Sequence, residues 1–398
     1  MRFRRGLLAL FVAATVTGCS ATISGTANPG LTPVDPATLR TGAYVPQPTA
    51  YTPKLYTIND MRLIEARRML GYLVHPASID ADLTQVGDVR FFDAADSPFT
   101  QKTLPDEYRP ATIDNNMLAG VYVSRINENL RSRKKLIVSV LRFPTDATAA
   151  KAAEDFGRIA ANPQTHPLTL DGHPEVRASS RDDSAGLAFL SRGPYVILVN
   201  AGVPQPDRAA VTQVLLTTVE RQLTLLDQLK PTPWDDVLDL PLDTDSIMRR
   251  ALPKAPDYSD PFTTDSDFGV YTPAAELHFE RNPVQVKKAF DDGGVDLVGR
   301  RAAVVYRARD LPAAFALQSA LMIAGRNDEI LDSPPGLPDV RCLRLDTRDF
   351  VRNYDEFCTV IRGRYVAVVV AETPIAARVD INLYQRAAAQ YAILANSE

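Results

Sequence analysis

The sequence is poor in the residues that most enzymes use for catalysis. Its 398 residues include 3 cysteines, 4 histidines and 1 tryptophan. It contains no Gly-x-Ser-x-Gly nucleophile elbow, no His-Glu-x-x-His, no P-loop, no Gly-x-Gly-x-x-Gly and no EF-hand spacing. These absences exclude the common signatures of hydrolases, kinases and dehydrogenases. The sequence therefore predicts no metal site and no cofactor, and it argues against an enzyme.

Long apolar runs are also missing, apart from a short one at the N-terminus. Residues 7–18 carry no charge and follow three arginines, Arg2, Arg4 and Arg5. A membrane-spanning helix needs about 20 apolar residues, so this run is too short to cross a bilayer. A basic start followed by a short apolar run instead predicts an export signal peptide. An N-terminal anchor helix is the alternative, but polar, proline-rich sequence follows directly.

The apolar run ends at a cysteine preceded by small residues. The four residues Val16-Thr17-Gly18-Cys19 resemble the bacterial lipobox, in which the cysteine sulfur is diacylated before the peptidase cleaves. We therefore expect residues 1–18 to be a lipoprotein signal peptide. Cys19 is then the lipidated position, carrying palmitate-like acyl chains that anchor the protein to the outer side of the cell membrane.

The charge balance and the next segment agree with this expectation. Loss of the three arginines would take the net charge from −4 to about −7. A mildly acidic protein has no electrostatic attraction to nucleic acid or to an anionic membrane surface, so we expect no nucleic-acid partner. Residues 19–53 are rich in Thr, Ala, Gly and Pro, a composition that predicts a flexible tether.

The body of the chain contains an internal repeat. The hexapeptide GHPEVR returns as GLPDVR, and neighbouring segments match in the same order. The matched pairs are 172–177 with 336–341, 192–199 with 362–369, 136–156 with 302–321, and Tyr-Thr-Pro at 51–53 with Tyr-Thr-Pro at 271–273. Each half reads as helix, strand, helix, three strands and helix. The sequence therefore predicts an α+β fold of two duplicated units, each an antiparallel sheet with helices packed on one face.

The repeat also sets the expected boundaries. The first unit spans 54–230 and contains an insertion at about 86–134 that the second unit lacks. A Pro- and Asp-rich linker follows at 231–267, and the second unit spans 268–398. We expect Trp234 to pack this linker onto a unit, with a ligand-stacking role as the alternative.

Two cysteines remain in the second unit, Cys342 and Cys358. An even pair outside the cytoplasm predicts a disulfide. The repeat aligns these positions with Ala178 and Ala188, two small residues, as expected for sites that face each other across adjacent strands. A redox or metal-binding pair is the alternative, but the spacing is far from Cys-x-x-Cys.

Two groups of polar residues are the candidate sites. His166, Asp171 and His173 form the one local cluster that could ligate a metal or perform acid–base chemistry, and an exposed loop is the alternative. The other two histidines, His75 and His278, stand apart.

Four arginines occur at repeated positions and could present an anion-binding site twice. They are Arg177, Arg192, Arg341 and Arg362. A solvated sheet face with modest cross-strand ion pairs is the alternative.

Three motifs carry a resemblance to a known family. They are the start GCSATISGTANPG, the YTP before EARRML, and the paired RGxYV strands. Together they resemble actinobacterial, chiefly mycobacterial, cell-envelope lipoproteins of unknown function. The resemblance implies an envelope setting and a two-part α+β body. Only Cys19 carries over as a functional residue.

The leading hypothesis is a non-catalytic lipoprotein that presents a duplicated platform to a lipid, glycan or protein partner of the envelope. The first alternative is an extracytoplasmic hydrolase that uses the loop with His166, Asp171 and His173. The second is a structural or accessory subunit of an envelope complex.

Overall fold

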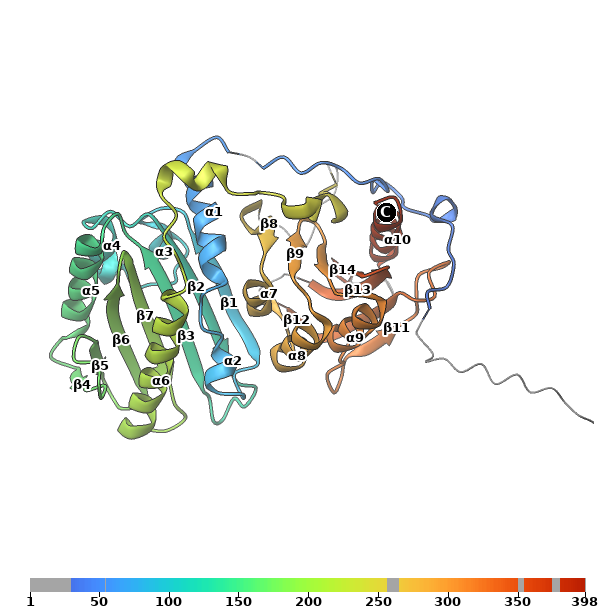
Figure 1. The fold of residues 1–398 in the computed structure, drawn as a ribbon. Coiled ribbons are helices and arrows are strands. Elements are labelled where there is room, and N and C mark those ends of the chain that lie inside the picture. Colours follow the sequence, from blue (N-terminus) through green and yellow to red (C-terminus); the bar gives the residue numbers. More distant parts are fainter. Residues whose placement is uncertain (1–29, 54, 256–264, 350–353, 374–379, 398) are drawn as a thin grey trace, which may run out of the picture.

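The computed structural model describes residues 30–53, 55–255, 265–349, 354–373 and 380–397. They form two α+β units, each built on a seven-stranded antiparallel sheet with helices against it (Figure 1). Cys19, the expected lipidated residue, lies outside the described residues. The duplicated α+β architecture expected from the repeat is confirmed.

The two sheets have the same strand order. From edge to edge the first sheet runs β1 (Gln85–Phe92), β2 (Ala119–Ile126), β3 (Lys135–Arg142), β7 (Tyr195–Gly202), β6 (Ala185–Arg192), β5 (Arg177–Ser180) and β4 (His166–Leu168). The second runs β8 (Gly269–Tyr271), β9 (Leu297–Arg300), β10 (Val304–Arg307), β14 (Tyr365–Ala371), β13 (Tyr354–Arg362), β12 (Arg341–Asp349) and β11 (Glu329–Leu331). Strands at equal positions therefore correspond one to one.

Helices cover both faces of each sheet, whereas the sequence led us to expect one covered face. In the first unit, α1 (Ile58–Leu70), α2 (Pro76–Ile79) and α6 (Arg208–Leu226) lie on one face, and α3 (Ser97–Thr100), α4 (Arg109–Ile113) and α5 (Asp146–Ala160) lie on the other. In the second unit, α8 (Pro283–Gly293) and α9 (Leu311–Leu321) lie opposite α10 (Ile381–Ala395). The reason is that central strands such as β7 and β14 are apolar on both sides, so each side needs a covering layer.

Capping residues set the starts of the main helices. Thr145, Asp207 and Asp310 precede α5, α6 and α9, and each side chain accepts a hydrogen bond from a backbone N–H three residues later. These caps satisfy donors that have no partner inside the helix, and so fix where each covering helix begins.

The repeated hexapeptides form the same turn in both units. Gly172 and Gly336 have φ angles of +80° and +81°, a left-handed conformation that favours glycine. Each turn leads directly into a strand, β5 after residue 176 and β12 after residue 340. The two copies therefore occupy equivalent places, and the repeated text reflects a repeated backbone requirement.

The structure corrects the expected insertion at 86–134. It contains β1 and β2, yet the second unit has β8 and β9 at the same sheet positions. What differs is strand length, 8 and 8 residues against 3 and 4, and the helices between the strands. The error came from matching Tyr-Thr-Pro at 51–53, which lies before α1, with 271–273, which joins β8 to α7 (Pro273–Glu276). In the part of the chain that the structure describes, no α-helix like α1 precedes β8 in the second unit.

The expected tether is also corrected where it is described. Residues 30–53 run along the second unit past α10 before reaching α1 (Figure 1). Tyr44 is only 3% exposed and packs in the core beneath α10. The Thr32 backbone N–H donates to the Asp339 carboxylate at 2.7 Å. The few large side chains of this segment are thus enough to dock it.

The linker between the units is docked as well. The guanidinium of Arg142 lies over the ring of Trp234 at 4.8 Å, which packs this part of the linker onto the first unit, as expected. Met248 and Leu252 are fully buried in the core of the second unit. The linker therefore packs against both units.

The units meet along a seam where β1 of the first sheet lies near β8 of the second. The rings of Phe91 and Tyr271 are 6.4 Å apart, and buried apolar side chains form one continuous cluster across the seam. On the second-unit side the seam is lined by α7 and a short 3-10 helix, η7 (Leu277–Phe279). Among the described residues, no helix combines the length and apolar character needed to cross a bilayer.

Candidate functional site

The structure does not bring His166, Asp171 and His173 together in a shared site. His166 on β4 places Nε2 2.8 Å from an Asp183 carboxylate oxygen. His173 places Nδ1 3.1 Å from Glu175, and Asp171 is exposed in the loop between them. Each histidine therefore has its own carboxylate, and no group of three metal-ligating side chains is found in the described ranges.

The four repeated arginines are separated by the sheets. Arg177 lies near Glu154 of α5 at 3.8 Å, and Arg341 contacts Ser319 of α9. Arg192 pairs with Asp227 after α6 at 2.7 Å, and Arg362 reaches Tyr391 of α10. Since α5 and α6 cover opposite faces, as do α9 and α10, each unit holds its two arginines on opposite sides. A common anion site is therefore not formed.

The second unit contains the predicted disulfide. Cys342 and Cys358 are bonded, and they are direct partners in the register of β12 and β13. In the first unit the corresponding direct partners of β5 and β6 are Ala178 and Ala188. The alignment of the two cysteines with two alanines is therefore correct in space.

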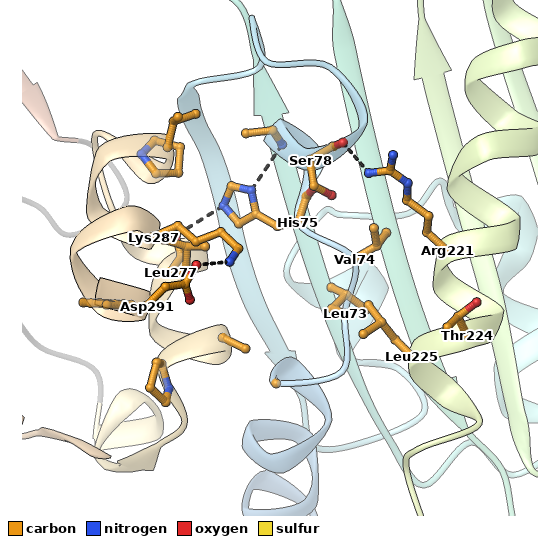
Figure 2. Close-up of a pocket in the computed structure, with 17 residues that line it drawn as sticks. Leu73, Val74, His75, Ser78, Arg221, Thr224, Leu225, Leu277, Lys287 and Asp291 are labelled. Atoms are coloured by element: carbon orange, nitrogen blue, oxygen red, sulfur yellow. Dashed lines mark hydrogen bonds and ion pairs between the residues drawn. The ribbon is translucent and has the colours of Figure 1, made fainter. Parts of the chain in front are cut away.

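A cavity of about 620 Å³ opens at the seam and forms the candidate site (Figure 2). Its first wall comes from the end of α1, from α2 and from α6, and its second wall comes from α7 and α8. The walls are chiefly apolar, formed by Leu73, Val74, Leu225, Leu277, Val284 and Phe290. Ligand sites typically have this size and character and often lie between domains.

Two histidines exchange hydrogen bonds across the seam beside this cavity. His75 places Nε2 3.3 Å from the Leu277 carbonyl oxygen of the second unit (Figure 2). In return, His278 of the second unit places Nε2 3.2 Å from the Leu73 carbonyl oxygen of the first. The ring centroids are 4.9 Å apart. Because carbonyl oxygens only accept, both Nε2 atoms carry the proton.

A buried arginine strengthens the same contact. Arg125 of β2 is fully buried, and its Nη2 donates to the carbonyl oxygens of His278 at 3.0 Å and Glu280 at 2.8 Å. The carbonyl ends of η7 therefore receive donors from a residue of the first unit. This connection fixes the second wall of the cavity relative to the first sheet.

Both histidines are held neutral. Burial lowers the pKa of His278 to about 3, and the charge of Arg125 adds to the effect. Burial also places the pKa of His75 well below 6.5, with smaller contributions from His278 and Arg125. The Nδ1 of His75 accepts from the Ala77 backbone N–H at 3.2 Å. At neutral pH both rings are neutral, and their Nε2 protons are used in the hydrogen bonds that join the two units.

The charged groups at the cavity rim lie on opposite walls. Lys287 and Asp291 of α8 form an exposed ion pair at 2.6 Å. Across the opening, Arg221 of α6 donates to the Ser78 carbonyl oxygen (Figure 2). The rim can therefore meet a polar end, whereas the interior suits an apolar group.

Sequence reasoning missed this site. Its walls come from residues 71–78, 221–225 and 273–291, which no motif connects. Gly71 is the one local signal, because a Cβ there would lie 2.7 Å from the Thr272 hydroxyl oxygen. A glycine that ends a helix is common, so the sequence alone does not reveal its contact with α7.

Family models match two consecutive parts of the chain. Residues 52–242 match a model described as Domain of unknown function (DUF7373) N-terminal, and residues 247–397 match Domain of unknown function (DUF7373) C-terminal. A comparison with curated proteins finds no match.

Among solved structures, the extracellular domain of PknH from Mycobacterium tuberculosis is similar at 14% identity and a TM-score of 0.28. The match covers 39% of this chain and 97% of that domain. A similarity this weak supports no argument about fold or function.

Proposed function

The chain belongs to the DUF7373 family, and we propose that it is an extracytoplasmic, lipid-anchored lipoprotein that binds an apolar envelope ligand without transforming it. The observation that carries the binding proposal is the apolar cavity of about 620 Å³ between the units. A cavity with leucine, valine and phenylalanine walls suits a lipid-like group better than a glycan, which would need many hydrogen-bonding partners.

The binding role is preferred to catalysis because the polar groups near the cavity already have partners. His75 and His278 are neutral and donate to backbone carbonyls, and Lys287 is paired with Asp291. The alternative of a hydrolase using His166, Asp171 and His173 has less support, since the two histidines contact different carboxylates. An accessory subunit of an envelope complex remains the second alternative.

Binding can be tested with N-phenyl-1-naphthylamine, a neutral apolar dye whose fluorescence rises in apolar surroundings. The protein would be the chain from residue 20, which keeps every described residue. Thr224 is exposed on α6 and lines the cavity, so Thr224→Trp should fill it and weaken dye binding at least tenfold. Gln213→Trp, an exposed position of the same helix outside the cavity, is the matched control.

The control should bind the dye within twofold of the unchanged chain. Equal dye binding by Thr224→Trp and the unchanged chain would contradict the proposal. A stable protein partner recovered with unchanged affinity from the Thr224→Trp variant, together with no dye binding, would favour the accessory subunit.

The anchoring part of the proposal rests on Val16-Thr17-Gly18-Cys19. Cys19→Ala should remove the acylation site and leave an uncleaved precursor. Fractionation with labelled palmitate would measure this. Mature-size protein of the Cys19→Ala variant in the membrane fraction would contradict lipid anchoring.

A further inference from the structure

A second cavity, of about 450 Å³, lies at another place where the parts of the chain meet. It is lined by the docked segment (Tyr51), by α1 (Asp60 and Arg67), by the linker (Lys254) and by the second unit (Phe268 before β8 and Arg301 after β9). These residues come from four separate stretches of the sequence, and they bring three positive side chains to one cavity. Asp60 is the one carboxylate residue among the described lining residues.

Neither Arg67 nor Arg301 forms a contact ion pair with a carboxylate among the described residues, although Asp243 of the linker acts on Arg301 at longer range. Arg67 donates through Nη1 to the Ser266 carbonyl oxygen at 2.8 Å. Arg301 donates to the carbonyl and hydroxyl oxygens of Thr49 at 3.2 and 3.1 Å, and lies over the ring of Tyr51. Both side chains are partly buried, and their hydrogen bonds to the described residues go to neutral oxygens.

Asp60 does not neutralise these charges by direct contact. Its carboxylate accepts from the backbone N–H groups of Tyr56 and Thr57 at 2.9 and 2.8 Å, which cap the start of α1. These hydrogen bonds are the main reason that its pKa is lowered. The carboxylate is therefore committed to the start of α1 and contacts neither guanidinium group.

Three other shielded arginines of this protein contact a glutamate, whereas Arg125 donates to backbone carbonyl oxygens. Arg142 contacts Glu65 at 2.6 Å, Arg300 contacts Glu276 at 2.5 Å, and Arg344 contacts Glu356 at 2.6 Å. Removing a guanidinium from water without an opposite charge is unfavourable. Burial accordingly lowers the pKa of Arg301. An anion in the cavity would supply the charge that these other sites obtain from glutamate.

The cationic cavity adjoins an apolar one. A cavity of about 340 Å³ shares Tyr51, Pro53 and Arg67 with it. The remaining walls of this smaller cavity are mainly apolar, including Ile64, Leu240, Leu242, Val270 and Leu297. Arg67 therefore lies where a charged compartment meets an apolar compartment. Thr272 lines the smaller cavity, and the neighbouring Gly71 lines the larger seam cavity, so the contact between them lies between the two cavities.

We propose that the two adjoining cavities form one site for an amphiphilic anion, with its phosphate or carboxylate head on Arg67 and Arg301 and its apolar tail in the smaller cavity. The guanidinium fork matches the oxygens of such a head in charge and geometry. This site differs from the one in the proposed function, both in its position and in its need for an anion.

Octyl phosphate, as a monomer, is the probe, and octanol is its neutral partner. The measurement is isothermal titration of the chain from residue 20 in the Thr224→Trp background, which removes binding in the larger cavity. Octyl phosphate should bind, and Arg67→Gln should weaken its binding at least tenfold. Arg67→Lys should weaken it less, because the charge remains. The matched control is Arg249→Gln, an exposed linker arginine outside both cavities, which should change binding by less than twofold.

A second variant tests the tail. Val270→Trp should fill the smaller cavity and weaken octyl phosphate binding while leaving any weak binding of inorganic phosphate unchanged. Vesicles containing phosphatidylglycerol, compared with phosphatidylcholine alone, then show whether a lipid can supply the anion. Capture of the former only would identify a lipid source, and no capture alongside octyl phosphate binding would identify a free amphiphile.

Three results would overturn the proposal. One is equal loss of binding in Arg67→Gln and Arg249→Gln, which would indicate attraction to net charge alone. Another is octanol binding as tightly as octyl phosphate, with no effect of Arg67→Gln. The third is no binding of octyl phosphate by a chain whose thermal unfolding is normal. None of these outcomes bears on dye binding in the larger cavity.

Discussion

The two units share one strand order but close their sheets by different means. In the first unit β1 and β2 are 8 residues long, and α3 and α4 add a covering layer on the α5 face. In the second unit β8 and β9 have 3 and 4 residues, and the α10 face is completed by residues 30–53 and by the linker. The two units therefore have the same strand order, but the layers that cover their sheets come from different parts of the chain.

This difference explains where the two smaller cavities lie. The α10 face of the second unit is covered partly by residues 30–53 and by the linker, which also reach the first unit. Gaps remain where these segments pass between the two units. Tyr51 and Phe268 line such a gap, as does Arg67 of α1. A unit closed entirely by its own helices leaves fewer places for a ligand between elements.

Each unit also contains a buried carboxylate paired with an arginine, and breaking either pair should have the largest effect. Glu276 contacts Arg300 at 2.5 Å, and Glu65 contacts Arg142 at 2.6 Å, with all four side chains almost fully buried. Glu276→Gln and Glu65→Gln should each lower the free energy of unfolding by about 3–5 kcal/mol, because a buried guanidinium loses its counter-charge. Urea unfolding would measure the loss.

Hydrogen exchange should show which unit is affected. Glu276→Gln should expose β9 and β10, whereas Glu65→Gln should expose β2 and β3. The control is the double replacement Glu276→Leu with Arg300→Met, which removes both charges and should cost less than Glu276→Gln alone. A single glutamine variant with unchanged stability would contradict this account of the buried pairs.

The disulfide is the next largest difference between the units. Replacing Cys342 and Cys358 together by alanine makes the second unit match Ala178 and Ala188 of the first. Because the bond closes a loop across a separation of 16 residues, the change should cost about 3 kcal/mol. Unfolding of the variant should therefore resemble that of the unmodified chain under reducing conditions. Equal stability of the bonded and alanine forms would show that the bond contributes nothing.

The repeat made β5, β6, β12 and β13 predictable from the sequence. Elements without a repeated motif were not predictable, for a physical reason. The turns before β5 and β12 favour glycine at 172 and 336, so this backbone requirement is visible as a repeated sequence motif. The segment at 30–53 left no such trace, because a few side chains such as Tyr44 are enough to dock it. Composition describes the average of a segment, whereas docking depends on single residues.

The candidate sites were less predictable than the fold for a related reason. His75 and His278 are about 200 positions apart and meet only because the two units dock. The clustering of His166 and His173 in sequence drew attention to a loop where each has a separate partner. Proximity in sequence indicates a shared site only when the intervening backbone returns to the same point.

Acid should weaken the seam between the units. In the folded protein burial lowers the pKa of His278 to about 3, whereas an unfolded histidine has a pKa near 6.5. Between these values the unfolded chain binds more protons, so stability is complete above pH 6.5 and falls as the pH drops toward 3. At pH 5 the loss should be on the order of 2 kcal/mol. Arg125 faces the same pair and disfavours a second positive charge.

Thermal unfolding from pH 7 to pH 5 would measure this dependence. The double variant His75→Gln with His278→Gln keeps amide donors for the carbonyls, and its stability should change less over this range. His166→Gln, at a partly exposed site in the first unit, should keep the full dependence. An unchanged slope in the double variant would contradict the assignment to the seam.

The smallest expected effect comes from giving the first unit the bond of the second. Ala178 and Ala188 are direct partners on β5 and β6, as Cys342 and Cys358 are on β12 and β13. Replacing both alanines by cysteine should allow a disulfide, detected as a joined peptide by mass spectrometry without reduction. The gain should be about 0.5–2 kcal/mol, below the loss in the second unit, because new sulfur atoms must fit a core already packed against α6. The reduced form of the same variant is the control, and it should be no more stable than the unchanged chain. Free thiols after oxidation would show that the two pairs of strands differ in geometry despite their equal register.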